Sequence, residues 1–342
     1  MIYYSSLILS IFILYFITSN LQNTTKARKI FFIFTCTLVI LFQGYRSFTV
    51  GTDLASYIPS YSVIGTQINS FSNLSFLNYE SGYVVYNKLL YTLGFDERSF
   101  LIITAMFIQI PIFYTMYKYS KKPLLSIFVY FAFSNFIMTF SGLRQSIAMS
   151  LCFYSYKFIK EKKILFYMVA IIIATLFHLS AIICLLLYPL YYIKLDTKKI
   201  IFVIVIIVGC LIFNNQIIQL ANQIYYGEGR EIVTTNAYTM LILYCILLII
   251  SYLINSNDYD YIGLRNILTC LCIIYTIAPV SNTFTRLGYP LSLYLTIFIP
   301  EIVLKINIKP NNLIKDIICY VICISCFFYF LGGLDTLPFS FL

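Results

Sequence analysis

The chain has 342 residues, of which 61% are hydrophobic and 11% are charged, and its formal net charge is +10. Soluble globular domains carry charges at about a quarter of their positions, so this composition excludes an ordinary soluble domain. The positive charge lies mostly in short loops between apolar segments, which favours a role in membrane topology over a nucleic-acid-binding surface.

Apolar segments follow one another along the chain and predict an all-α, polytopic membrane protein of about twelve membrane helices, some of them short or re-entrant. Segments such as 200–209 and 241–250 are apolar on every side, as helices that face lipid must be. The first segment has no basic residues before it and no cleavage site, so we expect a first span and not a cleaved signal peptide. We expect one integral membrane domain over residues 1–342, without an internal repeat. The predicted segments are 2–18, 29–45, 99–117, 123–141, 143–159, 164–177, 179–193, 199–216, 237–254, 264–281, 287–304 and 314–332.

Two long loops are predicted on the outer side of the membrane, over about residues 46–98 and 214–236. The first is polar at its start and becomes amphipathic over Gly82–Leu93, which predicts an interfacial or re-entrant helix too short to span. The second contains Gly227 and Gly229, which indicate a mobile segment.

Lysine and arginine sort into alternate loops. Lysine clusters occupy every second loop, and the positive-inside rule therefore places those loops in the cytoplasm and the remaining loops outside. We expect Arg98 and Arg230 to form solvated ion pairs with the acidic residues beside them. Of the 23 lysines and arginines, those in the outer loops are Arg46, Lys88, Arg98, Arg144, Arg230 and Arg286.

The only histidine, His178, lies between two apolar segments that together are short. Residues 164–193 give about 45 Å of helix, whereas two full crossings need about 60 Å. If the chain crosses twice with a bend near His178, this side chain is sunk in the outer half of the membrane, which requires a wet cavity lined by protein. A long tilted single helix is the alternative.

Arg144 opens a predicted helix, directly after Gly142-Leu143. The helix dipole opposes a cation at this end, so Arg144 requires an anionic partner. A guanidinium at a helix N-terminus also suits phosphate binding.

Two further arginines have related settings. Arg46 ends a predicted span, and Arg286 follows a span that Pro279 interrupts. Unwound backbone at membrane depth is acceptable mainly where it lines a cavity. We predict that Arg46, Arg144 and Arg286 converge in one outer cavity and bind a diphosphate. The alternative is that they snorkel to the outer headgroups or pair with Asp53 or Glu80.

Glu80 and His178 are the candidates for a general base. For Glu80 the alternative is a solvated loop residue, and for His178 a buried residue with its hydrogen bonds satisfied. We expect no metal, because no residues with ligand spacing surround the histidine. The ten cysteines lie in apolar segments and are expected to be small buried hydrophobes. Tyr57, Tyr83 and Tyr289 are outer aromatic residues that can stack on sugar rings.

These motifs together resemble the EpsG-like branch of the Wzy-type polysaccharide polymerases of bacterial envelopes. The resemblance covers most of the chain, and Glu80-Ser81-Gly82-Tyr83 departs from it by having serine where proline is commoner. The matching residues are Arg46, Gly51-Thr52-Asp53, Tyr57, Glu80-Ser81-Gly82-Tyr83, Asn87, Gly142-Leu143-Arg144-Gln145-Ser146-Ile147-Ala148, His178-Leu179-Ser180-Ala181, Arg286 and Tyr289.

The resemblance implies a metal-independent glycosyltransferase without a cofactor, similar to lipid-dependent enzymes of the GT-C type. It implies that undecaprenyl-diphosphate-linked oligosaccharides are polymerised at the outer leaflet of the bacterial cytoplasmic membrane, by transfer of the growing chain to the non-reducing end of a new unit. Its implied partners are those lipid-linked sugars, the bilayer, a chain-length regulator and a flippase. The implied site has Glu80 or His178 as base and Arg46, Arg144 and Arg286 on the diphosphate. The implied supporting residues are Asp53, Tyr57, Tyr83, Asn87, Gln145 and Tyr289.

Three other classes stay open. A flippase or transporter for lipid-linked oligosaccharides should show two related halves, which are not visible here. A ligase of the O-antigen type shares the donor chemistry but transfers to a lipid A core. An acyltransferase would use cytoplasmic acyl donors, and His178 lies on the opposite side in the predicted topology.

Overall fold

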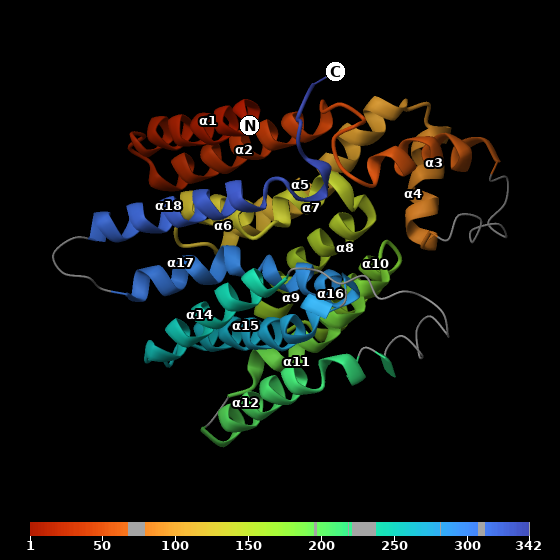
Figure 1. Ribbon diagram of the computed structural model, residues 1–342. Coiled ribbons are helices and arrows are strands. Elements are labelled where there is room, and N and C mark those ends of the chain that lie inside the picture. The colour runs from red at the N-terminus through yellow and green to blue at the C-terminus, as the bar shows by residue number, and fades with distance from the viewer. Residues whose placement is uncertain are drawn as a thin grey trace. The chain divides into compact units, whose positions relative to one another are not determined.

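The computed structural model describes residues 1–67, 79–194, 197–217, 219–220, 237–280, 282–306 and 312–341. Within these ranges the chain is helical and forms no strand, apart from one isolated antiparallel bridge between Arg46 and Phe341 (Figure 1). The chain divides into two compact units, Met1–Ile182 with Ile308–Leu342, and Ile183–Asn307.

All twelve predicted segments are helical, but fewer than twelve can cross a membrane alone. Among the described residues 5 helices are long and apolar enough, or up to 7 if each of two bent pairs is one span. The prediction of about twelve membrane helices, some of them short or re-entrant, is therefore not confirmed as a count of spans, because the other apolar helices have only 10–17 residues and a full span needs about 20. The 5 helices are α1 (Ile2–Ser19), α2 (Thr24–Gly44), α5 (Glu97–Tyr119), α15 (Tyr259–Ile277) and α18 (Asn312–Phe330).

In the first unit, α2 and α5 are antiparallel neighbours that cap each other's C-terminal ends. Arg28 of α2 donates to the carbonyl of Tyr117 at 2.9 Å, and Arg98 of α5 donates to the carbonyl of Gly44 at 2.6 Å. A guanidinium at a helix C-terminus satisfies free carbonyls and suits the helix dipole. Arg98 therefore does more than the predicted solvated ion pair: its hydrogen bonds go to the backbone at the end of α2, while Asp96 attracts its charge.

A buried polar network joins these helices to a broken span. Gln109 donates to the Gln43 side chain at 2.9 Å and accepts from the Tyr130 hydroxyl at 3.0 Å. Gln43 also donates to the backbone of Thr139 at 2.5 Å. Polar groups at membrane depth require such partners, because lipid offers none.

The broken span consists of α6 (Pro123–Ala132) and α7 (Asn135–Ser141), which meet at an angle of 55°. Ser134 at the break has a left-handed backbone conformation with φ +59°, which ends α6. Only Gly142 separates α7 from α8 (Leu143–Tyr154), and only Ser155 separates α8 from α9 (Tyr156–Lys160).

The predicted outer loop 46–98 contains two helices, α3 (Leu54–Gln67) and α4 (Ser81–Thr92). The short amphipathic helix expected at Gly82–Leu93 is thus confirmed as α4. These helices lie at the N-terminal end of α5, where the Tyr61 hydroxyl donates to the carbonyl of Phe95 at 2.7 Å.

The second unit is arranged around α15, which packs against all the other long helices there. The α15 helix gives way to a 3-10 turn, η3 (Ala278–Val280), so the interruption expected at Pro279 is confirmed. Most of the predicted loop 214–236, with Arg230, lies outside the described residues. The remaining elements are η2 (Leu179–Leu186), which extends across the boundary of the units, α11 (Leu187–Tyr192), α12 (Thr197–Ile212), α14 (Tyr238–Leu253), α16 (Asn282–Ser292) and α17 (Leu295–Lys305).

Candidate active site

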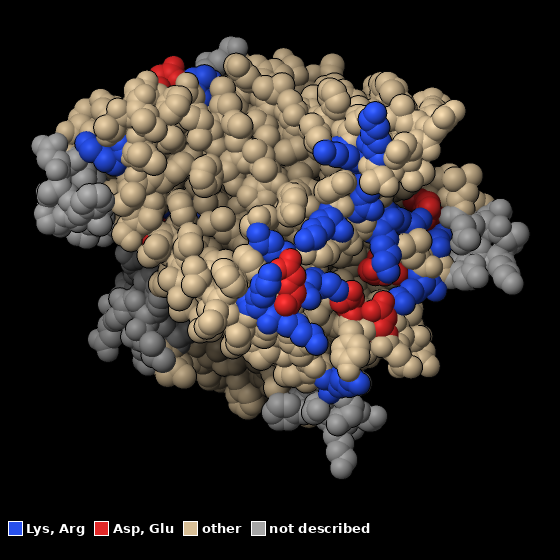
Figure 2. All heavy atoms as spheres, turned by 180° about the vertical axis from the view of Figure 1, so that it is seen from behind, with Lys and Arg blue, Asp and Glu red and all other residues tan. Residues whose placement is uncertain are grey.

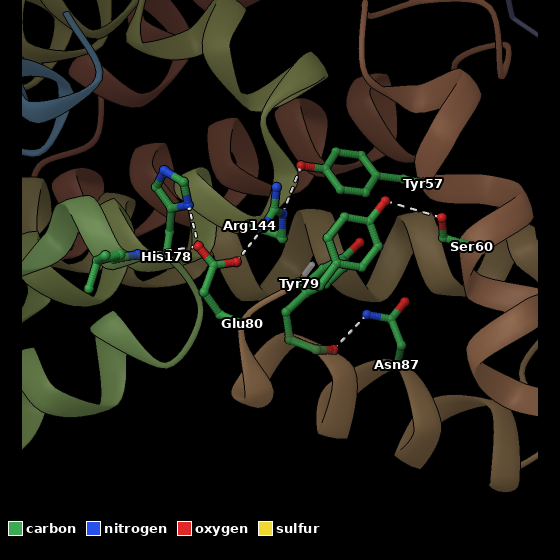
Figure 3. Close-up of polar contacts among 9 residues, drawn as sticks. Tyr57, Ser60, Tyr79, Glu80, Asn87, Arg144 and His178 are labelled. Atoms are coloured by element: carbon green, nitrogen blue, oxygen red, sulfur yellow. Dashed lines mark hydrogen bonds and ion pairs between the residues drawn. The ribbon is translucent and has the colours of Figure 1, made fainter. Parts of the chain in front are cut away.

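Three of the predicted residues meet around one carboxylate in the first unit (Figure 3). Glu80 immediately precedes α4, Arg144 is the second residue of α8, and His178 lies just beyond the end of α10 (Ile164–Thr175). Arg144 Nη1 donates to Glu80 Oε2, and His178 Nδ1 lies 2.8 Å from Glu80 Oε1. The three side chains are 22%, 20% and 15% exposed in the order Glu80, Arg144, His178, so solvent reaches each of them.

Gly82 allows the segment that carries Glu80 to pack against the segment that carries His178. The Gly82 N–H donates to the carbonyl of Leu176 at 2.9 Å, and the Leu179 N–H donates to Glu80 Oε1 at 3.3 Å. A Cβ atom at Gly82 would lie 2.7 Å from the Leu176 oxygen, which is closer than side-chain carbons approach backbone oxygens. Glycine at this position therefore allows the start of α4 to pack directly against the backbone of Leu176, two residues before His178.

Tyrosines hold the guanidinium of Arg144 from two further directions. Arg144 Nε donates to the Tyr57 hydroxyl at 3.3 Å, and the Tyr79 ring centroid lies 4.5 Å from the guanidinium carbon. The Tyr79 hydroxyl is in turn 3.1 Å from that of Ser60. Arg144 Nη2 has no hydrogen-bond partner among the described residues. The contacts of Nε and Nη1 thus fix the orientation of the guanidinium, while Nη2 makes no hydrogen bond to a described residue.

The electrostatics assign different properties to the two candidate bases. Partial burial favours the neutral form of Glu80, but the hydrogen bond with His178 and the charge of Arg144 outweigh it and lower the pKa of Glu80 to about 2. Glu80 is therefore a carboxylate at neutral pH and a weak base. As a carboxylate it can only accept the hydrogen bond from His178 Nδ1, and this contact does not use His178 Nε2.

The anionic partner that Arg144 requires at the N-terminal end of α8 is thus Glu80, which lies 64 residues away in the sequence. Tyr79, which sequence reasoning did not select, also belongs to the site. Its place directly before Glu80 was the only signal in the sequence that pointed to it.

Arg46 is in a different environment from Arg144. It is 1% exposed, and its guanidinium donates to three backbone carbonyls, those of Val50, Gln43 and Phe140. All three of its nitrogens are therefore occupied by protein. Contact of Arg46 with a diphosphate stays a prediction. The three hydrogen bonds do not favour it, because they already use every nitrogen of the guanidinium.

Arg286 belongs to the second unit, where it is exposed on α16 and interacts electrostatically with Tyr289. The proximity of the two residues follows from their spacing on one helix. Convergence of Arg286 with Arg144 stays a prediction.

The remaining supporting residues lie on the elements that carry the site. Tyr83 and Asn87 are buried in α4, where the Asn87 amide donates to the Tyr83 carbonyl at 2.7 Å, and the Tyr83 and Tyr57 ring centroids are 5.6 Å apart. Gln145 is buried beside Arg144 in α8. The backbone carbonyl of Asp53 accepts hydrogen bonds from the first turn of α3. Asp53 and Tyr83 thus contact Tyr57, and Asn87 contacts Tyr83.

Among the residues that the structure describes, no group of three or more His, Cys, Asp or Glu side chains is placed to hold a metal ion. In comparison with known protein families, the model of the EpsG family matches residues 29–341. No curated protein matches the chain, and no solved structure does. The matched range contains every residue of the candidate site.

Proposed function

Because the chain belongs to the EpsG family, we propose that it polymerises oligosaccharide units linked to undecaprenyl diphosphate at the outer leaflet of the bacterial cytoplasmic membrane. Membership of the family indicates a polysaccharide polymerase of the glycosyltransferase type, and the apolar helices indicate a membrane protein. The observation that carries the finer proposal is the Glu80 carboxylate held between Arg144 and His178.

The proposed reaction exchanges one bond to the anomeric carbon of the donor sugar for another. The bond from this carbon to the diphosphate oxygen of the growing chain breaks, and a bond to the non-reducing-end hydroxyl of a new lipid-linked unit forms. The diphosphate lipid leaves as an anion, and the proton of the attacking hydroxyl passes to the protein. The reaction therefore needs a base and a cationic partner for the leaving group.

His178 and Arg144 have the properties that these two roles require. His178 Nε2 accepts the proton, while Glu80 fixes the tautomer and stabilises the imidazolium that forms, as the carboxylate of a hydrolase triad does. Arg144 presents Nη2 to the diphosphate, and its fork geometry matches phosphate oxygens. Glu80 keeps this guanidinium in place before the donor binds.

Substitution of Arg144 tests the cationic role. In membranes supplied with lipid-linked repeat units, Arg144→Ala should leave single units unpolymerised, and Arg144→Lys should retain little activity because a point charge cannot replace a planar fork. A loss on the order of 10²–10³-fold in turnover is expected. Arg98→Lys is the matched control. Arg98 lies at the start of α5, and its guanidinium bonds the C-terminal end of α2 and not the candidate site. Near wild-type polymer ladders from Arg144→Lys would contradict the proposal.

Substitution of His178 tests the base. His178→Gln keeps a donor toward Glu80 but has no basic nitrogen, so turnover should fall on the order of 10²–10⁴-fold. Binding of a short-chain polyprenyl diphosphate should change little, whereas Arg144→Ala should weaken it. Turnover that survives His178→Gln would remove His178 from the chemistry.

The same assay separates the competing classes. A ladder formed from purified protein and lipid-linked repeats as the only sugar substrate is expected of a polymerase. A flippase would move these lipids without joining them, and a ligase would require a lipid A core acceptor.

A further inference from the structure

The direction in which Arg144 points depends on a very short turn. Only Gly142 separates the end of α7 from α8, and Arg144 is the second residue of α8. Because α7 is the short second half of a broken span, its own helix gives this turn little rigidity. Contacts from other segments must therefore hold the turn in place.

Arg46 and Gly51, in the loop 46–52, contact the end of α7 at Phe140. Arg46 Nη2 donates to the Phe140 carbonyl at 3.0 Å, and the guanidinium carbon lies 5.1 Å from the Phe140 ring centroid. Gly51, with φ +113°, packs so closely that a Cβ atom would lie 2.3 Å from the same carbonyl oxygen. This close approach explains why glycine occupies the position.

A third contact holds Ser141 itself. The Ser141 hydroxyl donates to the carbonyl of Leu334 at 2.9 Å and accepts from the Thr52 N–H at 3.0 Å. Ser141 is 1% exposed, so both hydrogen bonds are shielded from water. We call this set of contacts the turn clamp, and its residues are Arg46, Gly51, Thr52, Ser141 and Leu334.

The segment that carries Leu334 is anchored in turn to α1 and α2. The Tyr4 hydroxyl donates to the carbonyl of Thr336 at 3.1 Å, and the Phe339 and Phe42 rings stack with centroids 4.4 Å apart. The Gly51 and Thr52 N–H groups donate to the carbonyls of Asp335 and Leu334, at 3.0 and 3.1 Å. Two long helices therefore form the base against which the turn is held.

Arg46 stands out because a fully buried cation at the end of a membrane span is unfavourable unless it is fully bonded. Its three carbonyl bonds satisfy it, and they fix the spacing between α2, the 46–52 loop and α7 at the same time. We infer that the turn clamp positions Arg144 for the proposed glycosyl transfer. The inference rests on that proposed function.

Ser141→Ala tests the clamp, because it removes both hydrogen bonds of the hydroxyl without touching Arg144. Ser150→Ala is the matched control, since Ser150 is equally buried in α8 and bonds the Ile147 carbonyl at 2.8 Å. We expect Ser141→Ala to lower kcat/KM for the lipid-linked donor on the order of tenfold to a hundredfold, as misplacement of a substrate-binding group does. Ser150→Ala should alter thermal stability alone.

A double-mutant cycle separates positioning from general destabilisation. In an Arg144→Lys background, Ser141→Ala should cause little further loss, since the group that it positions is already replaced. Equal proportional losses in both backgrounds would mean that Ser141 acts only through stability and would overturn the inference. If Ser141→Ala does not accumulate, Arg46→Lys, which keeps the charge but not the three-way bonding, should give the same non-additivity.

Binding of a short-chain polyprenyl diphosphate distinguishes this inference from the function on which it rests. Wild-type protein that neither binds this lipid nor polymerises repeats would refute the proposed function. Binding that needs Arg144 but is equal in the Ser141→Ala and Ser150→Ala proteins would refute the clamp alone.

Discussion

At the scale of single residues, the behaviour of Glu80 is set by two hydrogen-bond partners of different kinds. Arg144 is permanently charged and bonds one carboxylate oxygen, while His178 Nδ1 bonds the other. The pair converts a residue that looks like a general base into a fixed anion. The histidine that it orients is then the base in the proposed reaction.

The lowered pKa of Glu80 predicts how stability depends on pH. The pKa is about 2 in the folded chain and 4.5 ordinarily, so the folded state holds fewer protons between these values. The contribution of Glu80 to stability is therefore complete above about pH 4.5 and is lost as pH falls toward about 2. The difference in melting temperature between wild type and Glu80→Gln should shrink over that window.

The chain has no tryptophan, but it has 32 tyrosines, so unfolding can be followed by calorimetry or by tyrosine fluorescence, which do not depend on the thiolate that a thiol-reactive dye needs. Carboxylates elsewhere titrate equally in both proteins and cancel in the difference. A difference that stays constant from pH 6 to pH 3 would show that Glu80 is not stabilised as a carboxylate.

At the scale of elements, the candidate site is made from the ends of short helices. Glu80 precedes α4, Arg144 begins α8 and His178 follows α10, and each of these helices has 12 residues. Helix ends present free backbone N–H groups and side chains that no neighbouring turn covers. Short helices that stop inside the protein are thus what allows polar groups to meet within an apolar fold.

Gly82→Ala tests the contact between two of these ends. The added methyl group would meet the Leu176 carbonyl and must push α4 away from the chain before His178. We expect turnover to fall at least tenfold, because the Glu80–His178 hydrogen bond lengthens. Gly209→Ala in α12 is the matched control, since nothing lies within 4 Å of a Cβ atom there, and it should be neutral. Full activity of Gly82→Ala would show that this approach does not set the geometry of the site.

At the scale of the whole molecule, charge is distributed as a membrane protein requires. In the face seen in Figure 2, charged side chains occur in several places, and broad areas of the surface carry none. Within the first unit, Arg46 and Arg98 lie at the N-terminal end of α5, and Lys118 and Lys122 lie at or just beyond its C-terminal end. The 23 residues of α5 extend about 34 Å, enough to cross the hydrocarbon core of a bilayer, which is about 30 Å thick.

This arrangement predicts the sidedness of the two ends. With a membrane-impermeant thiol reagent added outside intact cells, Asp96→Cys should be labelled and Lys121→Cys should not, because lysine loops stay in the cytoplasm. Both positions are exposed on the protein, so access is decided by the membrane. Labelling of the unsubstituted chain gives the background of its own cysteines. Labelling of Lys121→Cys from outside would invert the proposed topology.

The sequence alone determined what local composition controls. Hydropathy identified a membrane protein and located its apolar helical segments, because lipid exposure requires continuous apolar stretches. It did not predict α3, which lies in the loop that looked polar at its start. The motifs selected Glu80, Arg144 and His178 separately, and the helix dipole demanded an anion beside Arg144.

Only the tertiary structure decided which of these residues meet. Glu80, Arg144 and His178 come together through contacts between segments 64 and 98 residues apart, which no local pattern encodes. Hydropathy also could not decide how many of the apolar segments are full spans, since it cannot tell a crossing helix from a short one that ends inside the protein. A guanidinium bonds carbonyls as readily as phosphate, so Arg46 and Arg144 look alike in the sequence. Their surroundings separate them, because one is fully bonded by backbone and the other keeps an open edge.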